Sequence, residues 1–420
     1  MLILKRIKRI ITVTAIALMT LVVQVSCVRD NDSDDDVRRT VLVYMSAEHF
    51  NSSTVDFNIR GMQQDLGHGM ENVVLLAFVD KGNEKPYLLR IRKAKVGDDT
   101  GVDTIKVYDE MNTASPDALR TVIDEVKRDY PCDTYGLVLW SHGTGWIPRS
   151  HLKFTELGWS APKRNGGARE PEGLEFEITP DTKAFAVDDV DGKEYWMDID
   201  KMAGILYDHE FEFILFDACY MGCVEVLYAL RNKADYIVSS GIEIWSEGFP
   251  YFNITKDFMN GNLTKVCETF YNYYKNYNNP MAGISLVETR ELDSLARCFR
   301  KVVAAYDNVA KTDVTNIQSY DWFQNHLFFD LKDFVDRIDS QYKDEFTRQL
   351  ERCVLYKNST PYIFKGLPKQ RSLNTYCGLS VYIPLEKYDG DNYKEYKPGS
   401  LTLNESYRNT EWSIFTGYGY

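Results

Sequence analysis

A cysteine and a histidine each follow a strongly apolar segment of this 420-residue chain. The two segments are Phe213-Ile-Leu-Phe-Asp-Ala-Cys219 and Tyr135-Gly-Leu-Val-Leu-Trp-Ser-His142. Apolar runs of this length are typical of buried strands, and the carboxyl ends of parallel strands are where open α/β sheets build their sites. A thiol needs a nearby base to attack a carbonyl at neutral pH. The two segments therefore predict a nucleophilic Cys219 paired with His142; a buried structural cysteine and a hydrogen-bonded strand-end histidine are the alternatives.

An acidic residue, Asp217, lies two positions before the candidate nucleophile. Alternate residues of a strand share a face, so we expect its carboxylate to line the pocket beside Cys219. There it would bind a guanidinium or ammonium group and select Arg or Lys before the cleaved bond. The alternative is a strand-end aspartate that caps the following helix.

The first residues have the pattern of an export signal. Basic residues between Lys5 and Arg9 precede an apolar run, residues 10–23, that ends at Gln24-Val-Ser-Cys27. The run has signal-peptide length and is short for a transmembrane helix. Residues 1–26 resemble a lipoprotein signal with Cys27 as the lipidated N-terminus, although Gln24 stands where leucine is usual. Residues 27–39 are an acidic tether, so we expect a lipid-anchored protein of the bacterial cell envelope; ordinary secretion is the alternative.

Charge and cysteine usage narrow the class of protein. The formal net charge of −13 argues against nucleic acid as a partner. The chain has eight cysteines, so without Cys27 an odd number remains and at least one thiol is unpaired. Cys219 and Cys223 lack a matching His or Cys pair elsewhere, which argues against a structural zinc site.

Helical and strand patterns alternate along residues 40–255, which predicts a mostly parallel sheet with helices on both faces. Residues 256–420 are more helical and are expected to complete the sheet. Residues 146–182 lack periodicity, as expected of a functional or disordered loop. The expected strands are 40–45, 72–80, 135–142, 213–217, 234–240 and 378–384, the expected helices are 58–66, 116–130, 198–208 and 225–231, and residues 84–108 are expected to form a hairpin.

These blocks resemble the clostripain-type cysteine peptidases, caspase-fold endopeptidases that cleave after basic residues. The resemblance implies a caspase-like three-layer sandwich with a mostly parallel central sheet and a helix-rich C-terminal part. The chain departs from the family at Glu48-His49-Phe50 and at Glu247, where relatives have aspartate. The resembling blocks are Leu139-Trp-Ser-His-Gly-Thr-Gly-Trp146, Phe216-Asp-Ala-Cys-Tyr-Met-Gly222, Ala234-Asp-Tyr236, Gly248-Phe-Pro-Tyr251, Asp330-Leu331 and Gly378-Leu-Ser-Val-Tyr-Ile-Pro384.

The resemblance also implies roles for single residues. Cys219 would form a thioester while His142 protonates the leaving amine and then activates water. The backbone N–H groups of Gly143 and Cys219 would form the oxyanion hole; a plain turn glycine is the alternative for Gly143. Glu247 would join Asp217 in the substrate pocket, or be an ordinary surface glutamate. No cofactor is required, but calcium is possible because relatives depend on it; a solvated acidic loop is the favoured interpretation of Asp188-Asp-Val-Asp191.

The expected partners are protein or peptide substrates that contain Arg or Lys, and the membrane through the lipid. Relatives are processed between the two motifs, and Lys163, Arg164 and Arg169 offer basic sites for self-cleavage here; an ordinary exposed insertion is the alternative. Two other functions remain open: a catalytically inactive, envelope-anchored binding protein of the same fold, and another thiol hydrolase such as an amidase or a transpeptidase.

Overall fold

The structure is a computed structural model of the chain, and residues Val37–Tyr420 form one compact unit in it. Cys27, the rest of the signal and most of the tether lie outside the described residues, as does the segment 149–182. Among the described residues, no helix is long and apolar enough to cross a lipid bilayer. The described residues are 37–48, 50, 52–66, 70, 72–82, 84–93, 101–148, 183–190, 193–304, 306, 309–323, 325–367, 370–389 and 401–419.

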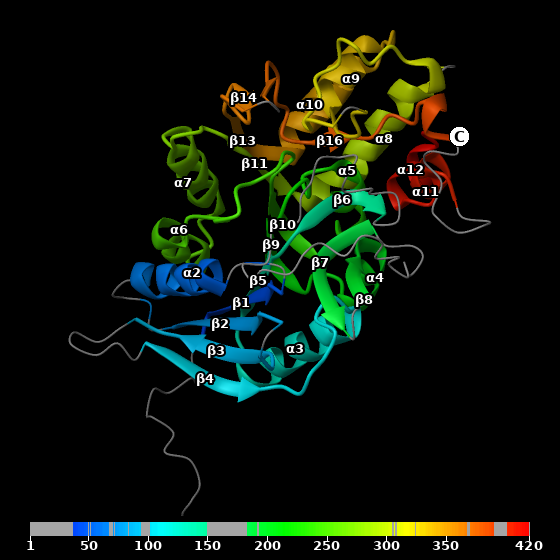
Figure 1. Cartoon of the computed structure of the whole chain (residues 1–420). Coiled ribbons are helices and arrows are strands. Elements are labelled where there is room, and N and C mark those ends of the chain that lie inside the picture. Colours follow the sequence, from blue (N-terminus) through cyan, green and yellow to red (C-terminus); the bar gives the residue numbers. More distant parts are fainter. Residues whose placement is uncertain are drawn as a thin grey trace, which may run out of the picture. The chain divides into compact units, whose positions relative to one another are not determined.

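A nine-stranded sheet forms the centre of this unit, with the order β13-β11-β10-β9-β5-β1-β2-β3-β4 (Figure 1). Its five middle strands, from β10 to β2, run parallel, and the outer strands are antiparallel. The mostly parallel α/β sheet expected from the sequence is therefore confirmed. The strands are β1 (Arg39–Ser46), β2 (Val73–Asp80), β3 (Tyr87–Ile91), β4 (Val102–Val107), β5 (Thr134–Trp140), β9 (Phe211–Asp217), β10 (Ala234–Ser239), β11 (Gly283–Glu288) and β13 (Val354–Ser359).

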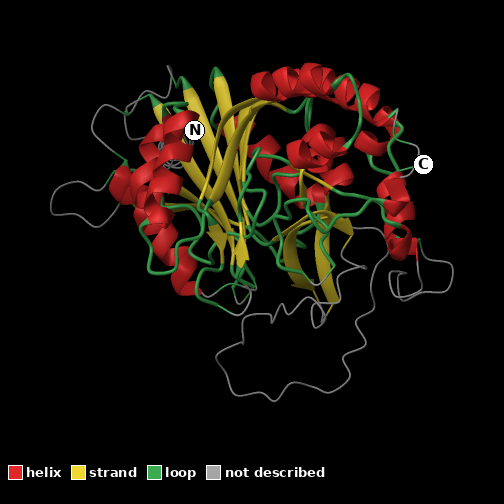
Figure 2. Ribbon diagram, turned by 90° about the horizontal axis from the view of Figure 1, so that it is seen from above, coloured by secondary structure: helices red, strands yellow, loops and turns green. Residues whose placement is uncertain are grey.

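Helices cover both faces of the sheet (Figure 2). The middle strands are apolar on both sides, so that Val41 and Val43 of β1 pack into one core while Leu42 and Tyr44 pack into the other. Such unbroken apolar runs are what a doubly covered parallel sheet requires. One face carries α2 (Ser52–Asp65), α6 (Tyr251–Met259) and α7 (Leu263–Lys275). The other core includes α3 (Pro116–Asp129), α4 (Ile199–Ile205), α5 (Val224–Ala229) and α8 (Leu292–Val303).

Element ends depart from the expected ones in several places. The helix expected to start at residue 58 begins at Ser52, and β5 ends at Trp140, two residues before His142. Helix α3 begins as expected, because Ser115 accepts a hydrogen bond from the backbone N–H of Ala118 and Pro116 fills the first helical position. The expected hairpin is formed by β3 and β4.

The expected late strand, residues 378–384, is wrong in extent and in place. Only β16 (Ser380–Val381) is a strand, and it pairs with β12 (Phe329–Asp330) outside the central sheet. The next residue, Tyr382, makes no strand bond with its N–H, which donates to the buried carboxylate of Glu225 instead. The remaining elements of this part are α9 (Leu331–Arg337), α10 (Lys343–Cys353), β14 (Tyr362–Ile363), β15 (Arg371–Ser372), α11 (Leu403–Arg408) and α12 (Glu411–Thr416).

A second, three-stranded antiparallel sheet lies at the carboxyl edge of the first. It consists of β6 (Gly143–Pro148), β7 (Lys183–Val190) and β8 (Lys193–Asp198). The sequence did not predict these strands. Because β6 pairs with β7, the two ends of the segment 149–182 start from neighbouring strands.

Candidate active site

The parallel register of β5 and β9 brings the two motifs together. Trp140 is paired with Asp217 in the sheet, and the N–H of Ser141 donates to the carbonyl of Asp217 at 3.3 Å. His142 and Cys219 thus follow two paired positions by the same number of residues. The next residue, Gly143, lies so close that a Cβ atom there would stand 2.6 Å from the carbonyl oxygen of Cys219. The histidine and cysteine motifs are therefore in direct contact, as expected from the sequence.

Cys219 lies in the turn after β9 and is 8% exposed. The next residue, Tyr220, has a φ of +60°, a left-handed conformation that is uncommon for a residue with a side chain and that gives the turn its sharpness. The backbone N–H of Ile244 points at the sulfur, with an N–Sγ distance of 3.4 Å. Burial, and then the charge of Glu243, raise the pKa of the Cys219 thiol. The resting cysteine is therefore protonated and needs a base to become a nucleophile.

The ring of Phe50 stacks on the imidazole of His142, with ring centroids 4.2 Å apart and planes 19° apart. The same phenyl ring packs on Trp140 at 4.3 Å. The backbone carbonyl of His142 accepts a hydrogen bond from the N–H of Ala186 in β7 at 3.2 Å. An aromatic ring on one side and β7 on the backbone side fix the position and plane of the imidazole.

The Asp217 carboxyl is buried and asymmetrically bonded. Its Oδ2 accepts hydrogen bonds from the N–H of Phe249 at 3.0 Å and from the hydroxyl of Tyr251 at 2.8 Å. Its Oδ1 is buried without a hydrogen-bond partner. Burial raises the pKa of Asp217 to about 7, against these two hydrogen bonds, which lower it. Phe249 lies just before α6 and Tyr251 is its first residue, so Asp217 does not cap helix α5, whose N-cap is Cys223.

The sequence argument placed Asp217 beside Cys219 because alternate side chains of a strand share a face. This alternation stops before the cysteine, because β9 ends at Asp217. Phe213 and Leu215 of β9 pack into the core beneath α2, α6 and α7, and Asp217 continues this alternation toward Phe249 and Tyr251 of the same core. The strand then ends, and Cys219 packs with the opposite core. The two residues are close because of the turn and not because they share one strand face.

Glu247 lies in the loop before α6, two residues before Phe249, one of the partners of Asp217. Its carboxylate accepts hydrogen bonds from the hydroxyls of Tyr277 at 3.0 Å and Ser246 at 3.3 Å. The hydroxyl of Tyr274 donates to the carbonyl of Gly248, and burial, followed by the negative charges of Asp217 and Glu247, raises the pKa of this tyrosine. The charges of both carboxylates thus act on the same tyrosine.

The acidic segment at Asp188 is occupied by protein donors. The Asp188 carboxylate accepts hydrogen bonds from the N–H and the hydroxyl of Thr113, and Glu48 accepts one from the N–H of Asp189. The part of the chain that the structure describes contains no group of three or more His, Cys, Asp or Glu side chains placed to hold a metal ion. Asp191 lies outside the described residues. The described side chains of this segment thus do not fit a calcium site, and we derive no step through a metal.

The other cysteines and histidines of the described chain have structural surroundings. Each of the seven described cysteines is a free thiol. Cys223, four residues after Cys219, is fully buried, and burial raises its pKa well above the ordinary value. His326 binds the buried Asp321 through Nδ1 at 2.7 Å, and His209 is exposed beside Asp235.

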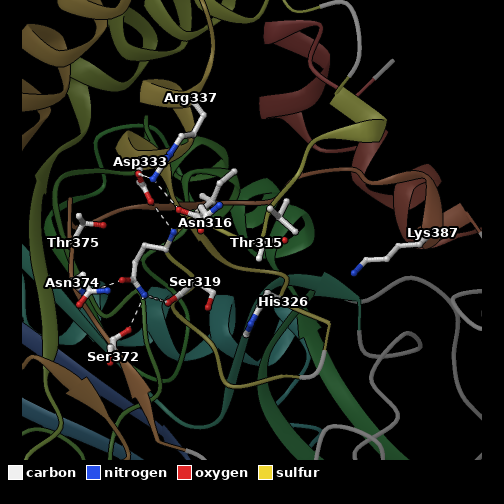
Figure 3. Close-up of a pocket in the computed structure, with 13 residues that line it drawn as sticks. Thr315, Asn316, Ser319, His326, Asp333, Arg337, Ser372, Asn374, Thr375 and Lys387 are labelled. Atoms are coloured by element: carbon white, nitrogen blue, oxygen red, sulfur yellow. Dashed lines mark hydrogen bonds and ion pairs between the residues drawn. The ribbon is translucent and has the colours of Figure 1, made fainter.

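A polar cavity of about 600 Å³ lies in the C-terminal part, among residues 314–319, the 372–375 loop and helix α9 (Figure 3). Arg337 on its wall pairs with Asp333 at 3.1 Å and donates to the carbonyl of Asn316 at 2.8 Å. Gln318 donates to two backbone carbonyls and accepts from the N–H of Asn374. None of the candidate site residues lines this cavity, and its polar groups are used to hold the loops together.

A family model for the clostripain family, Peptidase_C11, matches residues 43–169 and 172–416. The chain belongs to the clostripain family. It is similar to the inactive zymogen of a C11 protease from Parabacteroides distasonis, with 31% identity, a TM-score of 0.70, and coverage of 90% of this chain and 98% of that one. A secreted C11 cysteine protease from Bacteroides thetaiotaomicron, solved with an irreversible peptide inhibitor, is 27% identical with a TM-score of 0.69, over 90% of this chain and 98% of that one.

Clostripain itself, from Hathewaya histolytica, is 29% identical over 168 residues. That match covers 36% of this clostripain-family chain and 26% of the length of clostripain. The resemblance read from the sequence is thus confirmed at the level of the family and of the fold.

Sequence reasoning missed two residues: Phe50, which stacks on His142, and Glu243, which accepts a hydrogen bond from Tyr220, the residue after Cys219. Phe50 was noted only as a departure from the family, and Glu243 was not singled out. Both lie in loops that follow parallel strands of the sheet, β1 and β10. The sequence signal that could have found these two residues is the end of each parallel strand. The loops that follow such strands lie at the edge of the sheet where α/β proteins build their sites.

Proposed function

We propose that this chain is a cysteine endopeptidase that cleaves peptide bonds after Arg or Lys. The observation that carries the specificity is the Asp217 carboxyl, which is buried beside the nucleophile turn with one oxygen held by two donors and the other without a hydrogen-bond partner. A buried acceptor of this kind is costly until a donor reaches it. An arginine or lysine side chain of the substrate supplies that donor and its charge. Glu247, whose charge also acts on Tyr274, is the second carboxylate of the same pocket.

The chemistry follows from the state of the cysteine. The Cys219 proton passes to His142 as the sulfur attacks the substrate carbonyl, and the carbon–sulfur bond forms. The negative carbonyl oxygen is stabilised by the N–H groups of Gly143 and Cys219. His142 then gives its proton to the leaving amine as the carbon–nitrogen bond breaks, and it next activates the water that hydrolyses the thioester.

The decisive assay uses fluorogenic peptides that end in Arg, Lys or Gln, with wild type beside Cys219→Ala, His142→Ala and Cys223→Ala. We expect Arg and Lys peptides to be cleaved and both catalytic variants to lose at least about a thousandfold in kcat/KM, since single members of such a pair act as a unit. Cys223→Ala should stay active. Turnover that survives Cys219→Ala, or labelling of Cys223 in place of Cys219 by an Arg-directed acylating inhibitor, contradicts the proposal.

We also propose self-cleavage after Lys163, Arg164 or Arg169. The ends of the segment that contains them leave the adjacent strands β6 and β7, so a cut would leave two chains joined by the same sheet. Purified wild type and Cys219→Ala are incubated together and apart, and new N-termini are sequenced. An active wild type that remains one chain contradicts this, as does equal cutting of the two proteins when they are kept apart.

The envelope anchor is a separate proposal, because Cys27 lies outside the described residues. In a Gram-negative host we expect the protein to partition into the membrane and Cys27→Ser to release it. Mass spectrometry that finds a mature N-terminus other than Cys27 contradicts the lipoprotein assignment.

A further inference from the structure

The phenyl ring of Phe50 covers one face of the His142 imidazole. The ring centroids are 4.2 Å apart and the planes differ by 19°, so the two rings are stacked. His326 offers a contrast, because its ring stands nearly perpendicular to that of Phe329, at 6.3 Å and 81°. A cation over the face of an aromatic ring, within about 6 Å of its centroid, is attracted by the ring. The stacked geometry therefore places a positive charge on His142 where the phenyl face attracts it.

Contacts within the chain hold the phenyl ring in this place. Strand β1, which precedes Phe50, is the neighbour of β5, which precedes His142. The hydroxyl of Ser141 donates to the carbonyl of Ser46 at 2.6 Å and joins the two strand ends. The phenyl ring also packs on the buried indole of Trp140, with centroids 4.3 Å apart. The stack is thus part of the fold and needs no substrate to form.

The imidazole of His142 changes its charge during the proposed reaction. It becomes a cation when the Cys219 proton moves from Sγ to a ring nitrogen, and it is neutral again after that proton passes to the leaving amine. Burial raises the pKa of the Cys219 thiol, so the sulfur does not release this proton readily. An aromatic face attracts the charged imidazolium more strongly than the neutral ring. Phe50 therefore favours the form of His142 that exists while the sulfur attacks.

We propose that Phe50 is a positioning residue of the reaction, which acts through His142 by stabilising its imidazolium form with the phenyl face. This inference rests on the proposed function and deepens it. The effect is electronic as well as steric. A ring of nearly the same shape that attracts a cation less should still cover the imidazole, but it should no longer stabilise the positive charge.

The test replaces Phe50 by mono-, di- and pentafluorophenylalanine through nonsense suppression. Fluorine withdraws electrons from the ring and weakens its attraction for a cation step by step, while the ring keeps nearly the same shape. With Arg-aminocoumarin peptides, kcat should fall along the series to about a tenth of the wild-type value, the size expected of a partly desolvated cation–π contact. KM should change by less than about twofold, because the charge develops only after binding.

Alkylation of Cys219 by iodoacetamide gives a second readout that needs no substrate. The reagent is neutral and reacts with the thiolate, so its rate reports how readily the proton leaves the sulfur for His142. Mass spectrometry must localise the label to Cys219, because Cys223 and the other described cysteines are also free thiols. The alkylation rate should fall through the fluorinated series in the same order as kcat.

Control substitutions separate the electronic effect from a structural one. Phe57 is 42% exposed on α2 and packs on Phe252 at 4.6 Å. The same fluorinated residues at position 57 should leave kcat and the alkylation rate unchanged. Phe50→Leu removes the ring face and should be at least as slow as the pentafluoro protein, whereas Phe50→Tyr should restore most of the kcat that Phe50→Leu loses. The Tm of each protein shows whether the fold is kept.

Equal kcat values and equal alkylation rates through the fluorinated series overturn the proposal. A loss in Phe50→Leu alone would then show that the ring only fills space beside His142. A loss that is confined to KM also overturns the proposal, because it would place Phe50 in substrate binding. Failure of the proposed function looks different: wild type then cleaves no Arg peptide in a Cys219-dependent way, while the alkylation series still measures the effect of Phe50 on proton transfer.

Discussion

Asp217 and Asp330 are both buried and both end a strand, but their carboxylates are bonded in opposite ways. Asp330 ends β12, and both of its oxygens are used: Oδ1 accepts from the N–H of Asp333, and Oδ2 accepts from the hydroxyl of Tyr320 and the N–H of Cys377. Asp217 ends β9, and its two hydrogen bonds reach only Oδ2. A carboxylate that serves the fold has its hydrogen bonds completed within the chain, as Asp330 does at the N-cap of α9.

The difference teaches how the active-site region is organised. At the end of β12 the carboxylate ties together the start of α9, Tyr320 and the 377 region, so its function is complete in the folded chain. At the end of β9 the fold buries Asp217 and leaves its Oδ1 without a hydrogen-bond partner in the described chain. The following predictions test this contrast, from the largest expected effect to the smallest.

Gly143→Ala should have the largest effect, because the new Cβ would stand 2.6 Å from the backbone oxygen of Cys219. The backbone must shift, and a displacement of about 1 Å at the reacting groups costs about a hundredfold in rate. We expect kcat to fall by this order for Arg peptides. The matched control is Gly204→Ala in α4, where a Cβ meets nothing within 4 Å. A Gly143→Ala enzyme with normal kcat would show that this contact does not shape the site.

Asp217→Asn and Asp330→Asn should separate function from stability. We expect Asp217→Asn to reduce kcat/KM for Arg and Lys peptides at least about tenfold, because the charge that binds the cation is lost. Asp330→Asn should leave the preference for Arg over citrulline unchanged and reduce the free energy of unfolding by about 2 kcal/mol, since a buried network and a helix cap are damaged. Kinetics and denaturant unfolding measured on both variants decide the matter. If Asp217→Asn keeps its Arg preference, the contrast between the two aspartates carries no functional meaning.

The stability of Asp217→Asn relative to wild type should also depend on pH. The pKa of Asp217 is raised from 3.8 to about 7 in the folded chain, so the folded state holds the proton more tightly than the unfolded state. This group therefore removes stability as pH rises from about 4 to about 7, and the loss is complete above 7. At pH 8 we expect the Tm of Asp217→Asn to equal or exceed that of wild type, whereas Asp330→Asn should melt lower. A lower Tm for Asp217→Asn at pH 8 would mean that its charge is compensated in the folded chain.

The smallest expected effect is on the pH profile. Binding of a cationic side chain requires ionised Asp217, so kcat/KM for Arg peptides should fall by up to about tenfold per pH unit below a pKa of about 7 in the free enzyme. In Asp217→Asn, the part of this acid-side decrease that belongs to Asp217 should disappear. If kcat/KM decreases in the same way at acid pH in wild type and Asp217→Asn, the assignment of this titration to Asp217 is contradicted.

The local patterns of the chain were enough to predict the five parallel strands of the central sheet and the candidate site residues. Buried parallel strands leave unbroken apolar runs, and the residue that ends each run is conspicuous because it is polar. His142, Asp217 and Cys219 could be predicted for that reason, together with the α/β class. Element ends were less certain, because the first turn of α2 and the short strand β16 depend on partners that are distant in sequence.

Only the tertiary structure decided how the predicted residues are used. The register of β5 against β9 sets the contact of Gly143 with Cys219, and Asp217 takes its two hydrogen bonds from residues 32 and 34 positions later. Trp322 donates a hydrogen bond to Glu243 from 79 positions later in the chain, so the interaction that holds Glu243 could not be predicted from one segment. The sequence alone determined which chemistry each strand end offers, since residue type and strand burial are local properties. Packing between distant segments determines which buried carboxylate has an oxygen without a hydrogen-bond partner. This property therefore depends on the tertiary structure and not on local sequence.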